Sequence, residues 1–225
     1  MSMFRRYYGR PEYSAETNPS VLQALDAENG TRLYDVHQTL REVYPVLSNV
    51  TIVPEGRRGG TFIHGDGLNN LGIIFIAPEI ESNESFVDNG ITHVRYGRFD
   101  ERLARDNQKL SPQRLRTFEL LHEFGHAKAL EERIVLDLAV GIPEAESVAA
   151  MYDELRAVKD RFNETLSGYR ETILTGLPED AMGMDTATWL AYQQARERQY
   201  SLLPPEYDAD SFALGFFEHH PDLLA

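Results

Sequence analysis

Two histidines four residues apart are the feature of this sequence with the clearest chemistry. Residues 122 to 126 read His122-Glu123-Phe124-Gly125-His126. On an α-helix, residues four apart differ by about 40° and one turn, so both imidazole rings project from one face and can bind one metal ion. Glu123 lies about 100° round the helix from His122, where its carboxylate can hold a water molecule beside the metal. The spacing therefore predicts a metal site with an acid–base group next to it.

The flanking sequence predicts that these residues lie on a partly buried helix. Ser111 is suited to the N-cap and Pro112 to the first helical position. Apolar or small residues then recur at spacings of three and four and place the histidines beside a core-facing stripe: Leu115, Phe118, Leu121, Gly125 and Ala129. Gly125 costs about 1 kcal/mol of helix propensity relative to Ala, which indicates close packing against a neighbouring element. The alternative is a pair of core histidines satisfied by ordinary hydrogen bonds.

A catalytic zinc ion needs a third protein ligand and one position left open for water. If the helix simply continues, Glu132 lies about 240° round from His126 and faces away from the metal. Glu144 and Glu146 are better suited to the first turn of a following helix, where the helix dipole stabilises carboxylates. We therefore expect the third ligand to come from elsewhere in the chain.

Glu206 is the best candidate for that ligand. Pro204 and Pro205 are typical of a helix start, and the spacing of three and four places five residues on one face: Glu206, Ala209, Asp210, Ala213 and Phe217. The face is otherwise small and apolar, so its two carboxylates need partners. We expect Glu206 to bind the metal and Asp210 to accept a hydrogen bond from a metal-bound imidazole. The alternative is a surface helix whose carboxylates face water.

The two motifs together resemble those of a known family. HExxH followed some eighty residues later by Glu206-x-x-x-Asp210 is similar to the gluzincin zinc metallopeptidases, and most nearly to the catalytic core of the HtpX heat-shock proteases and CaaX prenyl proteases. The soluble ImmA/IrrE peptidases are a second resemblance, although their glutamate usually lies nearer the first motif. The resemblance implies a zincin fold, one Zn²⁺ per chain held by His122, His126 and Glu206, and Glu123 as catalytic base.

The activity to expect is that of a zinc metalloendopeptidase acting on a peptide or protein substrate. Zinc would activate a water molecule, and Glu123 would move its proton to the departing amine. Four side chains could stabilise the oxyanion, and the sequence does not choose among them: Tyr200, Tyr207, His219 and His220. The other histidines carry no ligand spacing and are expected to be structural or exposed: His37, His64 and His93.

Two other classes of function are compatible with the motifs. A non-catalytic regulatory or interaction module could use zinc for stability, but a purely structural site usually has four closed ligands and needs no Glu123. A helical scaffold could carry HExxH by accident, but the pairing of Glu206 with Asp210 argues against this alternative.

The elements before the first motif predict an α+β, zincin-like fold, in which a small mixed sheet packs on the HExxH helix and a mainly helical C-terminal subdomain follows. A helix is expected over residues 31–44, and strands over 50–53, 61–64 and 72–76, the last an inner strand because it is uniformly apolar. Thr61-Phe62-Ile63-His64 could form an exposed edge to which a substrate backbone adds. An ordinary hairpin edge is an equally good interpretation.

The remaining segments are predicted more coarsely. Residues 81–110 are polar and are expected on the surface, with one short strand at 92–96. A long helix is predicted over 143–174, a linker or mobile loop over 175–185, and a further helix over 189–199. The expected units are an N-terminal segment 1–30, a zincin N-subdomain 31–131, and a helical C-subdomain 132–225 that carries the third ligand.

Composition limits the partners and the compartment. The formal net charge of −14 over 225 residues argues against nucleic acid or an anionic membrane as the main partner. There is no cysteine, and so no disulfide framework or thiolate zinc site. No apolar run is long enough to span a bilayer, and no apolar segment follows the basic N-terminal residues. We expect a cytoplasmic protein without a membrane span, and a monomer rather than an oligomer.

Overall fold

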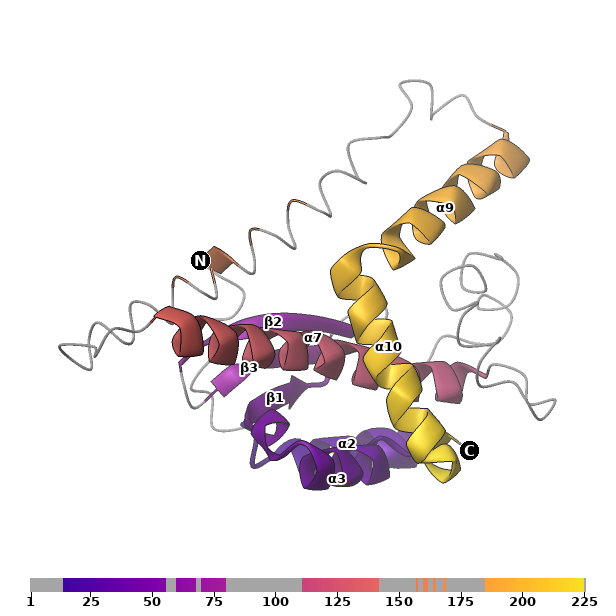
Figure 1. Cartoon of the computed structure of the whole chain (residues 1–225). Coiled ribbons are helices and arrows are strands. Elements are labelled where there is room, and N and C mark those ends of the chain that lie inside the picture. The colour runs from indigo at the N-terminus through magenta and orange to yellow at the C-terminus, as the bar shows by residue number, and fades with distance from the viewer. Residues whose placement is uncertain are drawn as a thin grey trace.

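A computed structural model describes residues 14–55, 60–67, 70–79, 111–141 and 185–224, and five single helical positions listed here: Ala157, Asp160, Arg161, Glu164 and Gly168. Figure 1 shows the arrangement of the elements in these ranges. The predictions for 81–110, for most of the 143–174 helix and for the 175–185 loop up to Asp185 lie outside the described residues. The boundaries of the three predicted units stay predictions.

Three strands form a small mixed sheet in the order β1-β3-β2: β1 (Val50–Val53), β2 (Gly60–Gly67) and β3 (Asn70–Ile76). β1 pairs parallel with β3, and β2 pairs antiparallel with it. β3 is the central strand and is buried along Leu71–Ile76, as its uniformly apolar sequence predicts. β2 is an edge of the sheet among the described strands, and it is longer than the predicted 61–64. The chain is thus α+β with a small mixed sheet, as predicted.

A helix that the sequence analysis did not predict covers the other edge of the sheet. α2 (Asn18–Asn29) begins with a proline in its first turn and ends at Gly30, whose φ of 66° lies in the left-handed region. The buried Asn18 side chain donates to the carbonyl of Val50 (2.7 Å) and accepts from the amide of Ile52 (2.8 Å). This side-chain amide therefore pairs with β1 as a neighbouring strand would, and it satisfies backbone groups at an edge.

α3 (Leu33–Val43) matches the helix predicted over 31–44, and its N-terminus is capped from α2. The carboxylate of Asp26 accepts hydrogen bonds from the amides of Leu33 (2.7 Å) and Tyr34 (2.8 Å), and from the hydroxyl of Thr31 (2.6 Å). Arg32, at the N-cap position, makes no side-chain cap. Asp26 therefore supplies the acceptors that the first amides of a helix lack. The short 3-10 helix η1 (Pro45–Asn49) then leads into β1.

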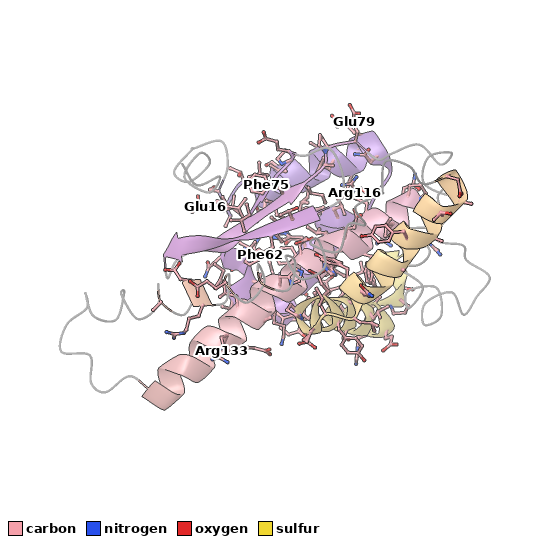
Figure 2. The ribbon with its side chains drawn as sticks, turned by 90° about the horizontal axis from the view of Figure 1, so that it is seen from above. Glu16, Phe62, Phe75, Glu79, Arg116 and Arg133 are labelled. Carbon is pink, nitrogen blue, oxygen red and sulfur yellow. The ribbon has the colours of Figure 1, made fainter. Side chains whose placement is uncertain are left out.

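The long helix α7 (Pro112–Gly141) carries the HExxH motif and runs alongside β2 and β3 (Figure 1). Ser111 Oγ accepts from the amide of Arg114 (3.2 Å), as predicted for an N-cap. Farther along, Arg116 donates to the carbonyl of Glu79 (2.9 Å), which ties the first turns of α7 to the chain just after β3 (Figure 2). The helix continues past position 131, where a subdomain boundary was predicted.

Two helices complete the described C-terminal part. α9 (Thr186–Ser201) matches the helix predicted over 189–199 and is capped by Asp185, which accepts from the amide of Thr188 (2.9 Å). α10 (Pro204–His219) crosses α7 (Figure 1), and the 3-10 helix η3 (Pro221–Leu224) follows it. One hydrophobic core joins α2, α3, the sheet, α7 and α10, and its members include Leu22, Leu33, Ile52, Ile74, Phe118 and Phe217.

His37 is fully buried in α3, and neither ring nitrogen has a hydrogen-bond partner within the described part of the chain. Its ring lies against Phe124 at 5.9 Å between centroids. Burial, with a contribution from the positive charge of Arg41, lowers the pKa of His37 to about 4. The imidazole is therefore a neutral core residue, in agreement with the structural role predicted for it.

Because the pKa of His37 is lower in the folded protein than in the unfolded chain, its contribution to stability is complete above about pH 6.5 and falls as the pH drops towards 4. We expect His37→Leu to remove this dependence. Relative to the wild type, the unfolding free energy of the variant should rise by about 2 kcal/mol between pH 8 and pH 5. Urea unfolding at both pH values measures this, with His219→Gln at an exposed site as control. An equal difference at both pH values would contradict it.

Candidate metal centre

The close crossing of α7 and α10 brings the two motifs together. A Cβ at Gly125 would lie 2.7 Å from the Cα of Ala209, so only glycine allows the two helices this approach. This packing is the reason predicted for Gly125. All five residues of the predicted α10 face are buried: Glu206, Ala209, Asp210, Ala213 and Phe217. The carboxylates of that face are therefore directed into the crossing and not to water.

Three buried side chains converge at this crossing. His122 Nε2 lies 3.2 Å from Glu206 Oε2, and His126 Nε2 lies 3.1 Å from His122 Nε2 and 3.7 Å from Glu206 Oε2. Ligand atoms about 2 Å from a tetrahedral zinc ion are separated by roughly 3.3 Å, so the three distances are those of a donor set around one ion. His122, His126 and Glu206 are thus close enough to hold a metal ion together.

Asp210 determines which nitrogen of His122 faces the cluster. Its Oδ1 lies 2.8 Å from His122 Nδ1, so Nδ1 carries a proton and donates it to the carboxylate. In the neutral ring, Nε2 is then an acceptor, and it faces another acceptor, the carboxylate of Glu206. Two acceptors at hydrogen-bond distance repel unless a cation lies between them. The arrangement therefore requires either a proton between these two atoms or a metal ion.

The charges of the site favour such a cation. Burial by itself lowers the pKa of His122, but hydrogen bonds to Asp210 and Glu206 and the negative charges of Glu123 and Asp210 outweigh it and raise the pKa to about 10. For Glu206, burial opposes the charged form, yet the bonds and charges of His122 and His126 hold the pKa of that carboxyl well below its usual range. A metal ion would replace the proton on His122 and keep Glu206 charged.

Glu123 lies between α7 and the edge strand. Its Oε2 accepts a hydrogen bond from the backbone amide of Phe62 at 2.6 Å, and its side chain is buried. Thr61 is exposed, Phe62 and Ile63 are half-buried, and the side chain of His64 lies outside the described residues. An edge strand near the site was predicted from the sequence, but the contact between Glu123 and that strand was not.

Tyr200 is the one of the four oxyanion candidates that the structure places against the cluster. Its hydroxyl, near the end of α9, donates to Glu206 Oε1 at 2.5 Å, which leaves Oε2 to face the histidines. Tyr207 is exposed, and His219 donates from Nδ1 to the carbonyl of Gly215 (2.7 Å). The ring of His220 packs on Phe216. The spacing of residues along the sequence does not predict the contact of Tyr200 with Glu206, because it depends on how the turn at 202–203 sets α9 against α10.

The carboxylates that the sequence analysis excluded as ligands are not in the cluster, as far as the structure describes them. Glu132 is exposed and pairs with Lys128, and it is not one of the clustered ligands. It borders a groove of about 580 Å³ between the end of α3, the middle of α7 and α10, which His219 and His220 also line. Glu144, Glu146 and His93 lie outside the described residues.

Comparisons of this chain with protein-family models, with curated proteins and with solved structures find no match. Within the part of the chain that the structure describes, no helix is long and apolar enough to cross a membrane. The function is therefore inferred from the geometry and chemistry of the site.

Proposed function

We propose that this protein is a zinc-dependent metallopeptidase of the gluzincin type. The observation that carries the proposal is the convergence of His122, His126 and Glu206, from two helices far apart in the sequence, on one point beside a further carboxylate. Two imidazoles and one carboxylate form a donor set typical of catalytic zinc, whereas calcium and magnesium prefer oxygen ligands alone. The proposed substrate is a peptide or protein, and the proposed reaction is hydrolysis of an internal peptide bond.

The side chains around the three ligands have distinct roles in this proposal. When bound, zinc would lower the pKa of a water molecule and polarise the scissile carbonyl. The carboxylate of Glu123 accepts the proton of the attacking water and then delivers it to the departing amine. Asp210 keeps the proton of His122 on Nδ1, so that the lone pair of Nε2 would be available to bind the ion. Tyr200 donates a hydrogen bond to Glu206 Oε1, which leaves Oε2 of that carboxylate facing the histidines.

A non-catalytic module stabilised by zinc is the second candidate. One observation favours it: the exposed fractions of His122, Glu123, His126 and Glu206 are only 3–6%, and a structural zinc site is closed to solvent. Against it stands Glu123, which is not needed to hold the metal. A structural site also usually has a fourth protein ligand, and the metal-ligating cluster found among the described residues has three.

Zinc content and peptide cleavage together test the proposal. Protein purified without added metal or affinity-tag histidines should contain about one zinc ion per chain by plasma mass spectrometry. It should cut an unbiased peptide mixture at internal bonds, as mass spectrometry of the fragments shows, and a chelator should stop cleavage until zinc is returned. One zinc without cleavage of any peptide or protein would favour the second candidate. Absence of zinc after incubation and dialysis would contradict both.

A further inference from the structure

The proposed base Glu123 is held by the edge strand as well as by its own helix. We propose that the start of β2, at Gly60 and Phe62, positions the Glu123 carboxylate for proton transfer. This inference rests on the proposed function and adds to it a positioning element that lies some sixty residues before the HExxH motif in the sequence.

The first observation is the hydrogen bond from the Phe62 amide to Glu123 Oε2, at 2.6 Å. Phe62 pairs with Ile74 of β3, and Figure 2 shows it where β2 passes over α7. A backbone amide in a paired strand cannot move without moving the sheet, and its bond to a charged oxygen is of the stronger kind. A free glutamate has up to about 2 kcal/mol of rotamer entropy to lose on being fixed. The strand removes this freedom before substrate binds, which is the requirement for efficient proton transfer.

The second observation is the space that Gly60 leaves for the same side chain. A Cβ at position 60 would lie 2.7 Å from Glu123 Cγ and 3.2 Å from Oε1. Among the described glycines only Gly30 has a positive φ, so the backbone at Gly60 accepts any residue. The absence of a side chain at Gly60 therefore serves the approach of Glu123, and not the conformation of the strand.

Phe62 is itself fixed by the sheet. A Cβ at Gly72 would lie 2.4 Å from the Phe62 ring and 2.5 Å from the carbonyl oxygen of Ile63. The ring therefore lies directly over Gly72 of β3, and it also packs against the main core. Gly72 fixes the Phe62 ring, and the Phe62 amide holds one carboxylate oxygen of Glu123. Gly60 leaves space for the Cγ methylene group of Glu123. These contacts connect the centre of the sheet to the proposed base.

The contact also has a consequence for substrate binding at this edge. A peptide that adds to β2 cannot use the Phe62 amide while Glu123 occupies it. If substrate displaced Glu123 from this amide, the contact would be a latch that restrains the base, and weakening it would raise activity. A positioning contact gives the opposite result, because weakening it lowers kcat.

The experiment compares Gly60→Ala with Gly215→Ala, a control in which the added methyl group meets nothing within 4 Å. Because Glu123 Cγ belongs to a flexible side chain, the methyl group at 60 should move Glu123 and leave the fold intact. We expect kcat to fall about 10- to 100-fold for Gly60→Ala, the effect of a displacement of about 1 Å. KM and zinc content should stay within about twofold, and the control should match the wild type.

A spectroscopic measurement tests the contact without using activity. In the zinc-loaded wild type, the Phe62 amide proton should resonate downfield, as expected for a short bond to a carboxylate. In Gly60→Ala and in Glu123→Ala it should move upfield, whereas in Gly215→Ala it should not move.

The inference and the proposed function fail in different ways. If the wild type cleaves peptides and the kcat of Gly60→Ala equals or exceeds that of the control, the positioning role is overturned and the peptidase stands. An unchanged Phe62 amide resonance in Glu123→Ala also overturns it. If the zinc-loaded wild type cleaves nothing, the proposed function fails and the positioning role fails with it.

Discussion

Glu206→Ala should weaken zinc binding more than about 100-fold, measured by competition with a chromophoric chelator. The reason is that the variant loses one of three ligands, and loss of a residue that only orients a ligand already costs roughly 10- to 100-fold. Asp208→Ala is the matched control, because Asp208 lies one half-turn farther along α10 and is exposed. We expect zinc affinity in that variant to equal that of the wild type.

The same variant shows whether Glu206 is a metal ligand or only a buried carboxylate of the core. Zinc at about 100 times its dissociation constant should stabilise the wild type by roughly 2.7 kcal/mol, and this stabilisation should be absent from Glu206→Ala at the same zinc concentration. If Glu206 only packs in the core, the variant lowers stability equally with and without zinc. Unchanged zinc affinity in a folded Glu206→Ala protein would exclude Glu206 as the third ligand.

The part of the site that the sequence predicts depends on local periodicity. Glu206 and Asp210 share one face with Ala209 and Ala213 because residues three and four apart on a helix are neighbours, and the structure buries that face. A glycine between the histidines indicated a close neighbour, and α10 is that neighbour. In each case one short segment is enough for the prediction. Carboxylates on a face that will be buried need partners, and a glycine on a helix face indicates a close neighbour, whatever the rest of the chain does.

The contacts that the sequence does not predict are those in which one partner is backbone or an unpatterned side chain. Asn18 was assigned to an N-terminal segment, because a single asparagine that completes the edge of β1 leaves no periodic signal. The amide of Phe62 is common to every non-proline residue, so nothing marks it as the partner of Glu123. Tyr200 is one of four oxyanion candidates in the sequence. Its hydrogen bond to Glu206 depends on the turn between α9 and α10, which no residue pattern predicts.

Glu123→Gln should lower kcat about 10²- to 10⁴-fold, the usual contribution of a general base, and leave one zinc ion per chain. The amide oxygen of glutamine can still accept the Phe62 N–H, and none of the three clustered ligands changes, so the fold and the metal are expected to persist. What is lost is the ability to take a proton from water. Steady-state kinetics on a cleaved peptide, with zinc measured on the same sample, gives both quantities.

The control for this variant is Glu132→Gln, on the same helix, where the side chain is exposed and does not belong to the cluster. It carries the same change of charge and should keep wild-type kcat, so a general effect of net charge is separated from the loss of a base. If Glu123→Gln cleaves as fast as the control, another group takes the proton, and the carboxylate between α7 and β2 is structural. If it retains zinc and cleaves nothing, the metal alone is insufficient, and a carboxylate is required at the position where the edge strand meets the HExxH helix.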